Sequence, residues 1–238
     1  MSDPNITKSD LVQSIRESLG LPPRKEGDSP VIVNESYSTQ AKKFKLATEL
    51  LSAKNKKSHQ DIFEKHVDEL NEISAKLDTA PRDDADPRFS EFRSLKVDEA
   101  HNLNGTFLHG MFFENISDVH SQVTMDSMAF MRLERDFGSF DDWQKDFIAC
   151  ALSSRNGWAV TIYNTFLNRY MNIVVDLHSQ NIPMASYPVI VIDCWEHAYY
   201  RDYLNERKTY IFAMMKELNW DTIEERFKKA ERISKATR

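Results

Sequence analysis

The chain has 238 residues, of which 41% are apolar and 29% charged, a composition typical of a folded globular protein. At roughly 100–200 residues per domain, this length allows one large domain or two small ones. The net charge of −6 disfavours nucleic acid or an anionic membrane as the main partner, and no apolar run comes near the roughly 18 residues of a transmembrane helix.

The first 36 residues read as a flexible extension. Residues 9–19 could form one short amphipathic helix, but the stretch GLPPRKEGDSP at 20–30 breaks any regular element. The start of the chain has neither the basic beginning nor the apolar segment of a secretory signal. Cys150 and Cys194 each lie in an apolar stretch, which favours free thiols over a disulfide. We therefore expect a cytoplasmic protein.

The next part of the chain has helical periodicity. Apolar residues recur at spacings of three and four, which predicts helices over about 40–78, 89–116 and 121–156. The stretch TAPRDDADPRFS at 79–90 reads as the linker of a helical hairpin. Gly105 weakens the second helix by about 1 kcal/mol relative to Ala, so it suggests close packing there.

Segments rich in β-branched and aromatic residues follow. They predict strands over 158–164, 170–178 and 187–193, and helical patterns return over 198–218 and 220–235. The fold class expected is α+β: an N-terminal helical hairpin domain followed by a small antiparallel three-stranded sheet with surrounding helices. The domain boundaries that follow are 1–36 for the extension, 37–120 for the hairpin domain and 121–238 for the α/β domain.

Asp193 and His197 form the most informative pair of polar residues. Asp193 ends the apolar segment VIVID, so its carboxylate is expected in the core, where an unpaired charge is costly. An imidazole four residues later could meet that carboxylate at a shared ion, and one oxygen ligand with imidazoles suits iron, manganese or zinc. The alternative is that Asp193 caps the helix that follows, and spacing alone does not separate the two.

Two further histidines have a suitable context. His109 lies among large apolar residues in FLHGMFFENI, and His59 precedes an amphipathic helical run. Neither histidine alone indicates a metal site, because such a site requires three or four convergent ligands.

Five stretches together resemble the iron/manganese superoxide dismutases. DCWEHAYY at 193–200 resembles the family signature D-x-W-E-H-A-Y-Y, and the segment around His109 resembles the branch that reads L-H-x-x-x-F-E-N-L. RDFGSFDDWQKDF, NGWAV and HQDIFEKHVDELNEI resemble further family segments. The resemblance covers about 40–235 and leaves 1–36 without a counterpart.

The resemblance implies a function and a set of ligands. One iron or manganese ion per chain would be held by His59, His109, Asp193 and His197, with a water or hydroxide as fifth ligand. By alternate reduction and oxidation of this ion, the enzyme would convert superoxide to dioxygen and hydrogen peroxide. A homodimer is implied, with a tetramer possible.

Two positions near the implied centre depart from the family pattern. Most members place a glutamine against the metal-bound solvent, but the corresponding helix position is Gly105. The resemblance therefore points to His178 for this role, with Gln180 as the alternative. The family's gateway position, at the entrance to the metal site, is usually a tyrosine. Here His66 occupies it, beside Phe63, and an imidazole there could still relay protons.

Four more residues take roles from the resemblance. Trp158 and Trp195 would line the metal site and keep it apolar, while Glu196 and Tyr200 match residues of the family's dimer contact. The glutamate of one subunit would orient the ligand histidine of the other.

Two other functions compete with the enzyme. The extension 1–36 and the altered gateway are compatible with a non-catalytic subunit of the same fold in a larger assembly, although the four ligands are present. A non-haem iron oxygenase with two histidines and one carboxylate is disfavoured by the third histidine and by the signature at 193–200.

Overall fold

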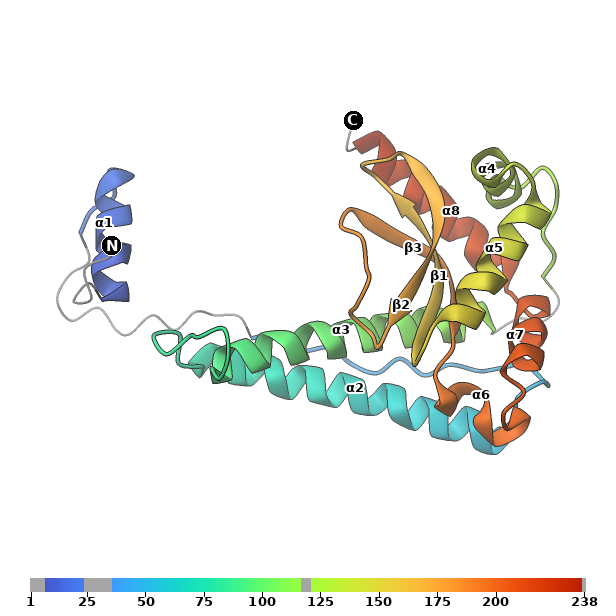
Figure 1. Ribbon diagram of the computed structural model, residues 1–238, viewed down its shortest axis with the longest axis horizontal. Helices are drawn as coiled ribbons and strands as arrows, with labels where there is room; N and C mark the ends of the chain where they lie inside the picture. Colours follow the sequence, from blue (N-terminus) through green and yellow to red (C-terminus); the bar gives the residue numbers. More distant parts are fainter. Residues whose placement is uncertain (1–6, 24–35, 117–120, 237–238) are drawn as a thin grey trace.

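A computed structural model of the chain describes residues 7–23, 36–116 and 121–236, and Figure 1 shows how the elements are arranged. The elements are α1 (Lys8–Ser18), α2 (Ala53–Thr79), α3 (Glu91–Asn115), α4 (Met128–Phe137), α5 (Phe140–Ser153), β1 (Gly157–Asn164), β2 (Arg169–Asp176), β3 (Ser186–Asp193), α6 (Glu196–Tyr203), α7 (Arg207–Lys216) and α8 (Trp220–Ala236). The predicted α+β class is confirmed: a helical hairpin precedes a three-stranded antiparallel sheet with helices around it.

The hairpin consists of α2 and α3, which lie side by side along most of their length (Figure 1). The buried face of α2 repeats every three or four residues, as an amphipathic helix requires; its members are Asn55, His59, Phe63, Val67, Leu70, Ser74 and Leu77. The side chain of Ser52 caps the helix by accepting a hydrogen bond from the backbone N–H of Asn55.

The predicted helix over 40–78 is wrong for its first part, because residues 40–48 have no regular secondary structure and run along α2. Side chains of α2 bond the backbone of this segment: Gln60 Nε2 donates to the carbonyl of Phe44 at 2.7 Å, and Lys56 Nζ to that of Leu46 at 3.2 Å. These tertiary bonds satisfy carbonyls that a helix would otherwise satisfy locally.

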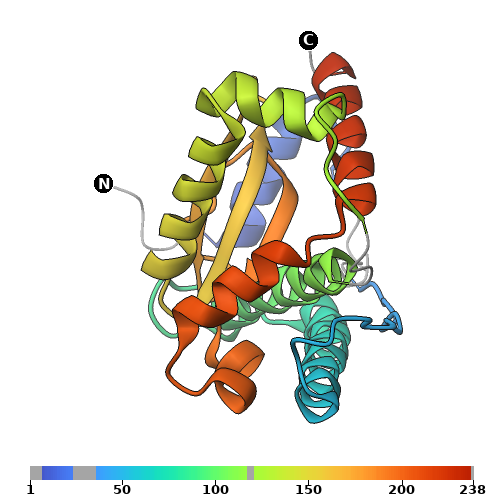
Figure 2. The same cartoon turned by 90° about the vertical axis from the view of Figure 1, so that its right-hand side faces the viewer.

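The sheet has the strand order β2-β1-β3, and both pairings are antiparallel. The central strand β1 is buried along its whole length. Figure 2 shows the sheet above the hairpin, with α5 on one side, α8 on the other and α4 across the top between them. Because α3 packs against β3, the end of β3 lies close to the hairpin, toward the start of α2 and the end of α3.

Two predicted helices are each broken in the structure. The helix over 121–156 is divided into α4 and α5 at Gly138, whose φ of 92° is readily adopted only by glycine. Ser139 then caps α5 by accepting from the N–H of Asp142 at 3.0 Å. The helix over 198–218 is divided into α6 and α7 at Leu204, which has a φ of 51°.

The strand predicted over 170–178 ends earlier, at Asp176. Leu177 adopts a φ of 54° and starts a turn, so His178 lies just outside the strand. The His178 side chain is nonetheless buried, with 2% of its surface exposed.

Helix α1 lies apart from the other elements in Figure 1. A capping box between Thr7 and Asp10 starts it, and Leu11, Ile15 and Leu19 are exposed along one face. The remainder of the predicted extension, 1–6 and 24–35, lies outside the described residues. None of the described helices combines the length and apolar character needed to cross a membrane.

Candidate metal centre

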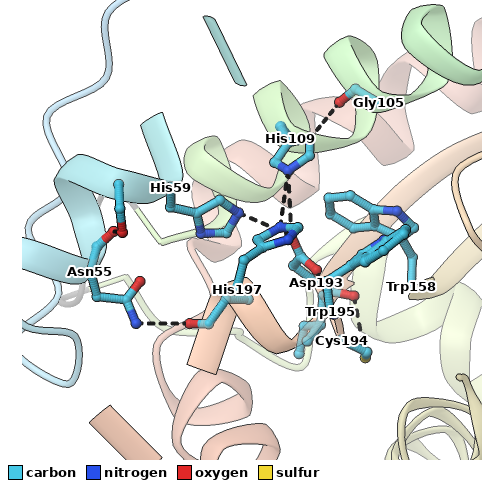
Figure 3. A network of polar contacts seen from close by, with 12 residues as sticks. Asn55, His59, Gly105, His109, Trp158, Asp193, Cys194, Trp195 and His197 are labelled. Carbon is cyan, nitrogen blue, oxygen red and sulfur yellow. Dashed lines mark hydrogen bonds and ion pairs between the residues drawn. The ribbon is translucent and has the colours of Figure 1, made fainter. Parts of the chain in front are cut away.

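Four residues from both halves of the fold meet at the end of β3 (Figure 3). His59 lies in α2, His109 in α3, Asp193 is the last residue of β3, and His197 lies in the first turn of α6. One ligand atom from each lies within 4.8 Å of all the others. The structure therefore brings together the four residues that the sequence predicts as ligands.

The Asp193 carboxylate is the centre of this arrangement. Its Oδ2 lies 3.0 Å from Nε2 of His59, 3.2 Å from Nε2 of His197 and 3.6 Å from Nε2 of His109. Its Oδ1 accepts a hydrogen bond from the backbone N–H of Trp195 at 2.8 Å. Asp193 does not cap α6, because the N-cap residue is Trp195 and the helix has no side-chain cap bond. Its Oδ1 holds the backbone just before the helix, and its Oδ2 faces the histidines.

The tautomer of His109 supports a cation at this point. Its Nδ1–H donates to the carbonyl of Gly105 at 2.6 Å, so the neutral ring carries its lone pair on Nε2. That atom lies 3.4 Å from Nε2 of His197. Converging ring nitrogens beside a buried carboxylate are the donor set that iron, manganese and zinc accept, so the residues present fit the metal that the resemblance implies.

Burial and mutual proximity shift the pKa values of these groups. Burial lowers the pKa of His59 and, more strongly, that of His109. Burial also opposes ionisation of Asp193, but the neighbouring His197 and His59 outweigh it and hold the pKa of that carboxyl below its usual range. At neutral pH the site therefore offers an ionised Asp193 with neutral His59 and His109, the forms that bind metal.

Aromatic side chains surround the cluster. Phe112 and Phe113 are fully buried and lie 5.4 and 4.9 Å from the ring of His59, centroid to centroid. Trp158 meets His109 edge to face at 4.9 Å, and Trp195 stacks on His197 at 5.7 Å. The two tryptophans thus line the cluster from the side of the sheet and α6.

His178 lies beside the cluster, whereas Gln180 does not. The Trp158 Nε1–H donates to His178 Nδ1 at 3.0 Å, and Trp195 stacks on the His178 ring at 4.9 Å. Burial, and secondarily the nearby His66, lowers the pKa of His178 to about 3. Gln180 is exposed after the turn, with its backbone bridged to Asp176.

His66 fills the space that Gly105 leaves on α3. A Cβ at Gly105 would lie 3.0 Å from Nδ1 of His66, and that nitrogen is 2.8 Å from Oδ1 of Asn102. The His66 ring lies 5.3 Å from that of His109. Phe63, the other gateway position, is buried against Phe113 instead.

Sequence reasoning missed His101. Its ring lies 4.6 Å from that of His178 and 5.8 Å from that of His66, centroid to centroid. The sequence holds no signal for it, because a half-buried histidine on a helix is ordinary and the contact depends on how α3 packs against α2 and the turn after β2.

Glu196 and Tyr200 are exposed on α6. With His197 and Arg201 they line a surface cavity of about 470 Å³, completed by Ser58 and Ile62 of α2. One face of the metal cluster therefore opens toward the surface where the predicted dimer residues lie.

Comparison with known proteins gives a consistent result. The family profile described as "Iron/manganese superoxide dismutases, C-terminal domain" matches residues 126–226, which include Asp193 and His197. "Superoxide dismutase [Fe]" of Aquifex aeolicus is 36% identical over 171 residues, covering 71% of this chain and 79% of that protein. "Superoxide dismutase [Mn] 1" of Halobacterium salinarum is 35% identical over 133 residues, covering 56% and 66%. By sequence similarity and fold, the chain belongs to the iron/manganese superoxide dismutase family.

Proposed function

We propose that His59, His109, Asp193 and His197 bind one iron or manganese ion, and that the protein uses it to convert superoxide to dioxygen and hydrogen peroxide. The observation that carries this is the convergence of three imidazoles on one buried carboxylate. When bound, the ion supplies the one-electron exchange by which two superoxide anions and two protons become one dioxygen and one hydrogen peroxide. Relatives of this chain are named for iron and for manganese, so both metals are tested below.

His178 is proposed as the hydrogen-bond donor to the oxygen species in the site. An indole N–H can only donate, so the bond from Trp158 makes His178 Nδ1 an acceptor and places the proton of the neutral ring on Nε2. The ring is locked in this orientation by stacking on Trp195. A fixed donor stabilises negative charge on oxygen without reorganisation.

His66 is proposed as the gateway residue, and Asn102 sets which of its ring nitrogens carries the proton. The Asn102 amide donates its Nδ2–H to the carbonyl of Asp98, which leaves Oδ1 to accept from His66 Nδ1–H. The His66 Nε2 then carries the lone pair. Donor His178 and acceptor His66 are complementary, and their rings lie 4.7 Å apart.

A homodimer built on Glu196 and Tyr200 is also proposed, with a tetramer as the alternative. The support is that both residues are exposed beside His197, around the cavity described above. Analytical ultracentrifugation of the full chain distinguishes monomer, dimer and tetramer. A cytoplasmic location is proposed because Cys150 and Cys194 are both free thiols, which is usual in a reducing compartment.

Metal content and activity, measured on the same sample, test the proposed function. We expect about one iron or manganese ion per chain together with dismutation of superoxide. His197→Ala should lose bound metal and activity together, because only two imidazoles then remain beside the buried carboxylate. Elemental analysis and a dismutation assay are the measurements, and the chain is refolded with each metal in turn.

The control is His120→Ala, since this histidine is not one of the four and lies outside the described residues. It should keep both metal and activity. Full metal content in His197→Ala would overturn the ligand assignment, and a wild-type chain that binds metal without activity would overturn the function.

The role of His178 is tested separately by His178→Ala. We expect the metal to stay bound and the dismutation rate to fall about 10- to 100-fold, as is typical when a group that hydrogen-bonds around a metal is removed. Gln180→Ala is the matched control and should leave the rate unchanged, because Gln180 is exposed. The opposite pattern, a slow Gln180 variant and a normal His178 variant, would reverse the assignment.

A further inference from the structure

We propose that His66, His101 and His178 form a second metal site, which binds zinc beside the superoxide dismutase centre and inhibits the enzyme when filled. The three residues come from α2, from α3 and from the turn after β2. One ring nitrogen from each lies within 4.8 Å of the other two. Among the described residues, this is the one candidate metal-binding group besides the four-residue centre.

The rings are arranged around a common point. His178 meets both other rings nearly edge to face, His66 at 4.7 Å and 81°, and His101 at 4.6 Å and 71°. His66 and His101 lie farther apart, at 5.8 Å. We expect rotation of the three side chains to bring one nitrogen of each ring to about 2.0–2.1 Å from a shared zinc ion, the usual length of a zinc–histidine bond.

Two of the three rings have a lone pair ready for a metal. The bond from His66 Nδ1–H to Asn102 fixes the tautomer and leaves His66 Nε2 free to bind, an arrangement common among metal-bound histidines. His101 makes ring contacts but no hydrogen bond in the part of the chain that the structure describes. Burial lowers the pKa of His101, so this ring is neutral at pH 7.

Zinc binding requires a change of tautomer in His178. Its Nδ1 accepts from Trp158, so its Nε2 carries a proton and cannot bind a cation in this state. Binding of zinc at Nε2 moves that proton to Nδ1, where it faces another donor, and the bond to Trp158 is lost. Filling the second site therefore removes the donor that we assign to catalysis, which is why zinc is expected to inhibit.

The ligands select the metal. Three imidazoles without a carboxylate suit zinc and disfavour magnesium or calcium, which take oxygen ligands. Three protein ligands also leave a fourth position open to water, as in catalytic zinc sites. Asp98 and Glu69 lie close enough to His101 to favour positive charge there, which offsets part of the repulsion from the neighbouring metal.

The experiment uses the full chain with its iron or manganese in place and quantified. The protein is dialysed against Zn²⁺, and against Co²⁺ as a spectroscopic substitute, and both metals are measured again. We expect one additional ion per chain, no loss of the resident ion, and visible Co²⁺ absorption typical of a four-coordinate site. His101→Gln should bind the additional ion at least tenfold more weakly, and circular dichroism confirms that it is folded.

His120→Gln is the matched control, because it removes one imidazole that belongs to neither candidate ligand group of the described residues. Its binding should equal that of the wild type. Absence of an additional ion in the wild type, or equal binding by His101→Gln, would overturn the proposed site. Weaker binding in the His120 variant alone would place the ion elsewhere and would also overturn it.

The inhibition rests on the proposed function, whereas the binding does not. Each protein is assayed with and without zinc, relative to its own zinc-free rate. Zinc should slow the wild type and spare His101→Gln; equal slowing of both would show that zinc inhibits at another place. If the wild type binds the second ion but never dismutates superoxide, the proposed function fails and the zinc site stands.

Discussion

Gly105 acts on two histidines at once. Its carbonyl accepts from His109 Nδ1–H, and its missing side chain leaves room for the His66 ring, which lies 3.0 Å from the position a Cβ would take. The sequence suggested close packing at this glycine, and the structure identifies what packs there. The position at which the family resemblance leads us to expect glutamine thereby makes room for His66, the proposed gateway residue.

Alanine substitutions in α3 test this packing. Alanine at either Gly105 or Gly110 gains about 1 kcal/mol of helix propensity. At Gly110 the new methyl meets only Phe44, at 3.8 Å, so stability should rise, whereas at Gly105 it crowds His66. Overpacking costs about 1–3 kcal/mol, so the metal-free Gly105→Ala protein should be less stable than Gly110→Ala by that amount in urea unfolding. Equal stability of the two variants would contradict the packing.

The predictability of the site differs from residue to residue. The convergence of His59, His109, Asp193 and His197 was predictable because DCWEHAYY is a dense signature and the other two histidines lie in recognisable segments. Spacing could not separate His178 from Gln180, since the choice depends on where β2 ends and how Leu177 turns. His101 could not be predicted, because its neighbours are set by the packing of helices far apart in sequence.

At the scale of elements, Arg226 joins α8 to the helix and strand that carry two of the proposed ligands. Its guanidinium donates to Asn115 Oδ1, to the carbonyl of Met111 at 3.0 Å and to Glu114 at 2.9 Å. Asn115 in turn donates to the carbonyl of Val191 in β3 at 2.6 Å. This buried network fixes α3 against β3, and with it His109 against Asp193.

Removal of Arg226 should therefore be costly. Arg226→Ala leaves buried acceptors without a donor, and we expect it to lower the free energy of unfolding by about 2–4 kcal/mol. Lys42→Ala is the control, because Lys42 pairs with the same Glu114 from the exposed side and surface pairs contribute about 0–1 kcal/mol. Thermal or urea unfolding of the two variants measures these losses. Similar losses of unfolding free energy in both would mean that the Arg226 network does not join these elements.

The elements themselves were mostly predictable, and the errors have physical causes. Hydrophobic periodicity located the hairpin helices and the three strands. It could not detect the breaks at Gly138 and Leu204, because apolar spacing continues across a single residue of positive φ. It also assigned 40–52 to a helix, although the segment from 40 to 48 is held by side chains of α2.

At the scale of the whole molecule, one main buried core encloses the charged groups of the candidate site. We propose that residues 37–120 and 121–238 are separate domains, each supplying two of the four ligands. The main core nevertheless spans both, since Phe112 and Phe113 belong to the same buried cluster as Trp158 and Val191. Without metal, this shared core must enclose one carboxylate and several imidazoles.

The metal-free protein should accordingly lose stability as the pH falls below about 6.5. Burial lowers the pKa of His59 and His109 in the folded state, so in that range the unfolded chain binds more protons. Their contribution is present above pH 6.5 and is lost as the pH falls, by up to about 1.4 kcal/mol per pH unit for each ring. The pKa of Asp193 is lowered in the folded state, so its contribution to stability is lost only below about pH 4.

Urea unfolding of the metal-free protein at pH 7.5, 6.5 and 5.5 measures this dependence. We expect about 1–3 kcal/mol less stability at pH 5.5 than at pH 7.5. His109→Gln should show a flatter profile, since it removes one of the buried rings. A stability that is constant or rises toward acid would contradict the sign derived from these pKa shifts.

The distribution of the four ligands along the chain also sets a schedule during protein synthesis. His59 emerges early and His197 last, 138 residues later, which at about 5–20 residues per second is a delay on the order of 10 s. Until then a nascent hairpin offers only two of the four proposed ligands, His59 and His109, too few to complete the centre. If the four residues bind the metal as proposed, the choice between iron and manganese is made by a nearly finished chain and depends on which ion is available at that moment.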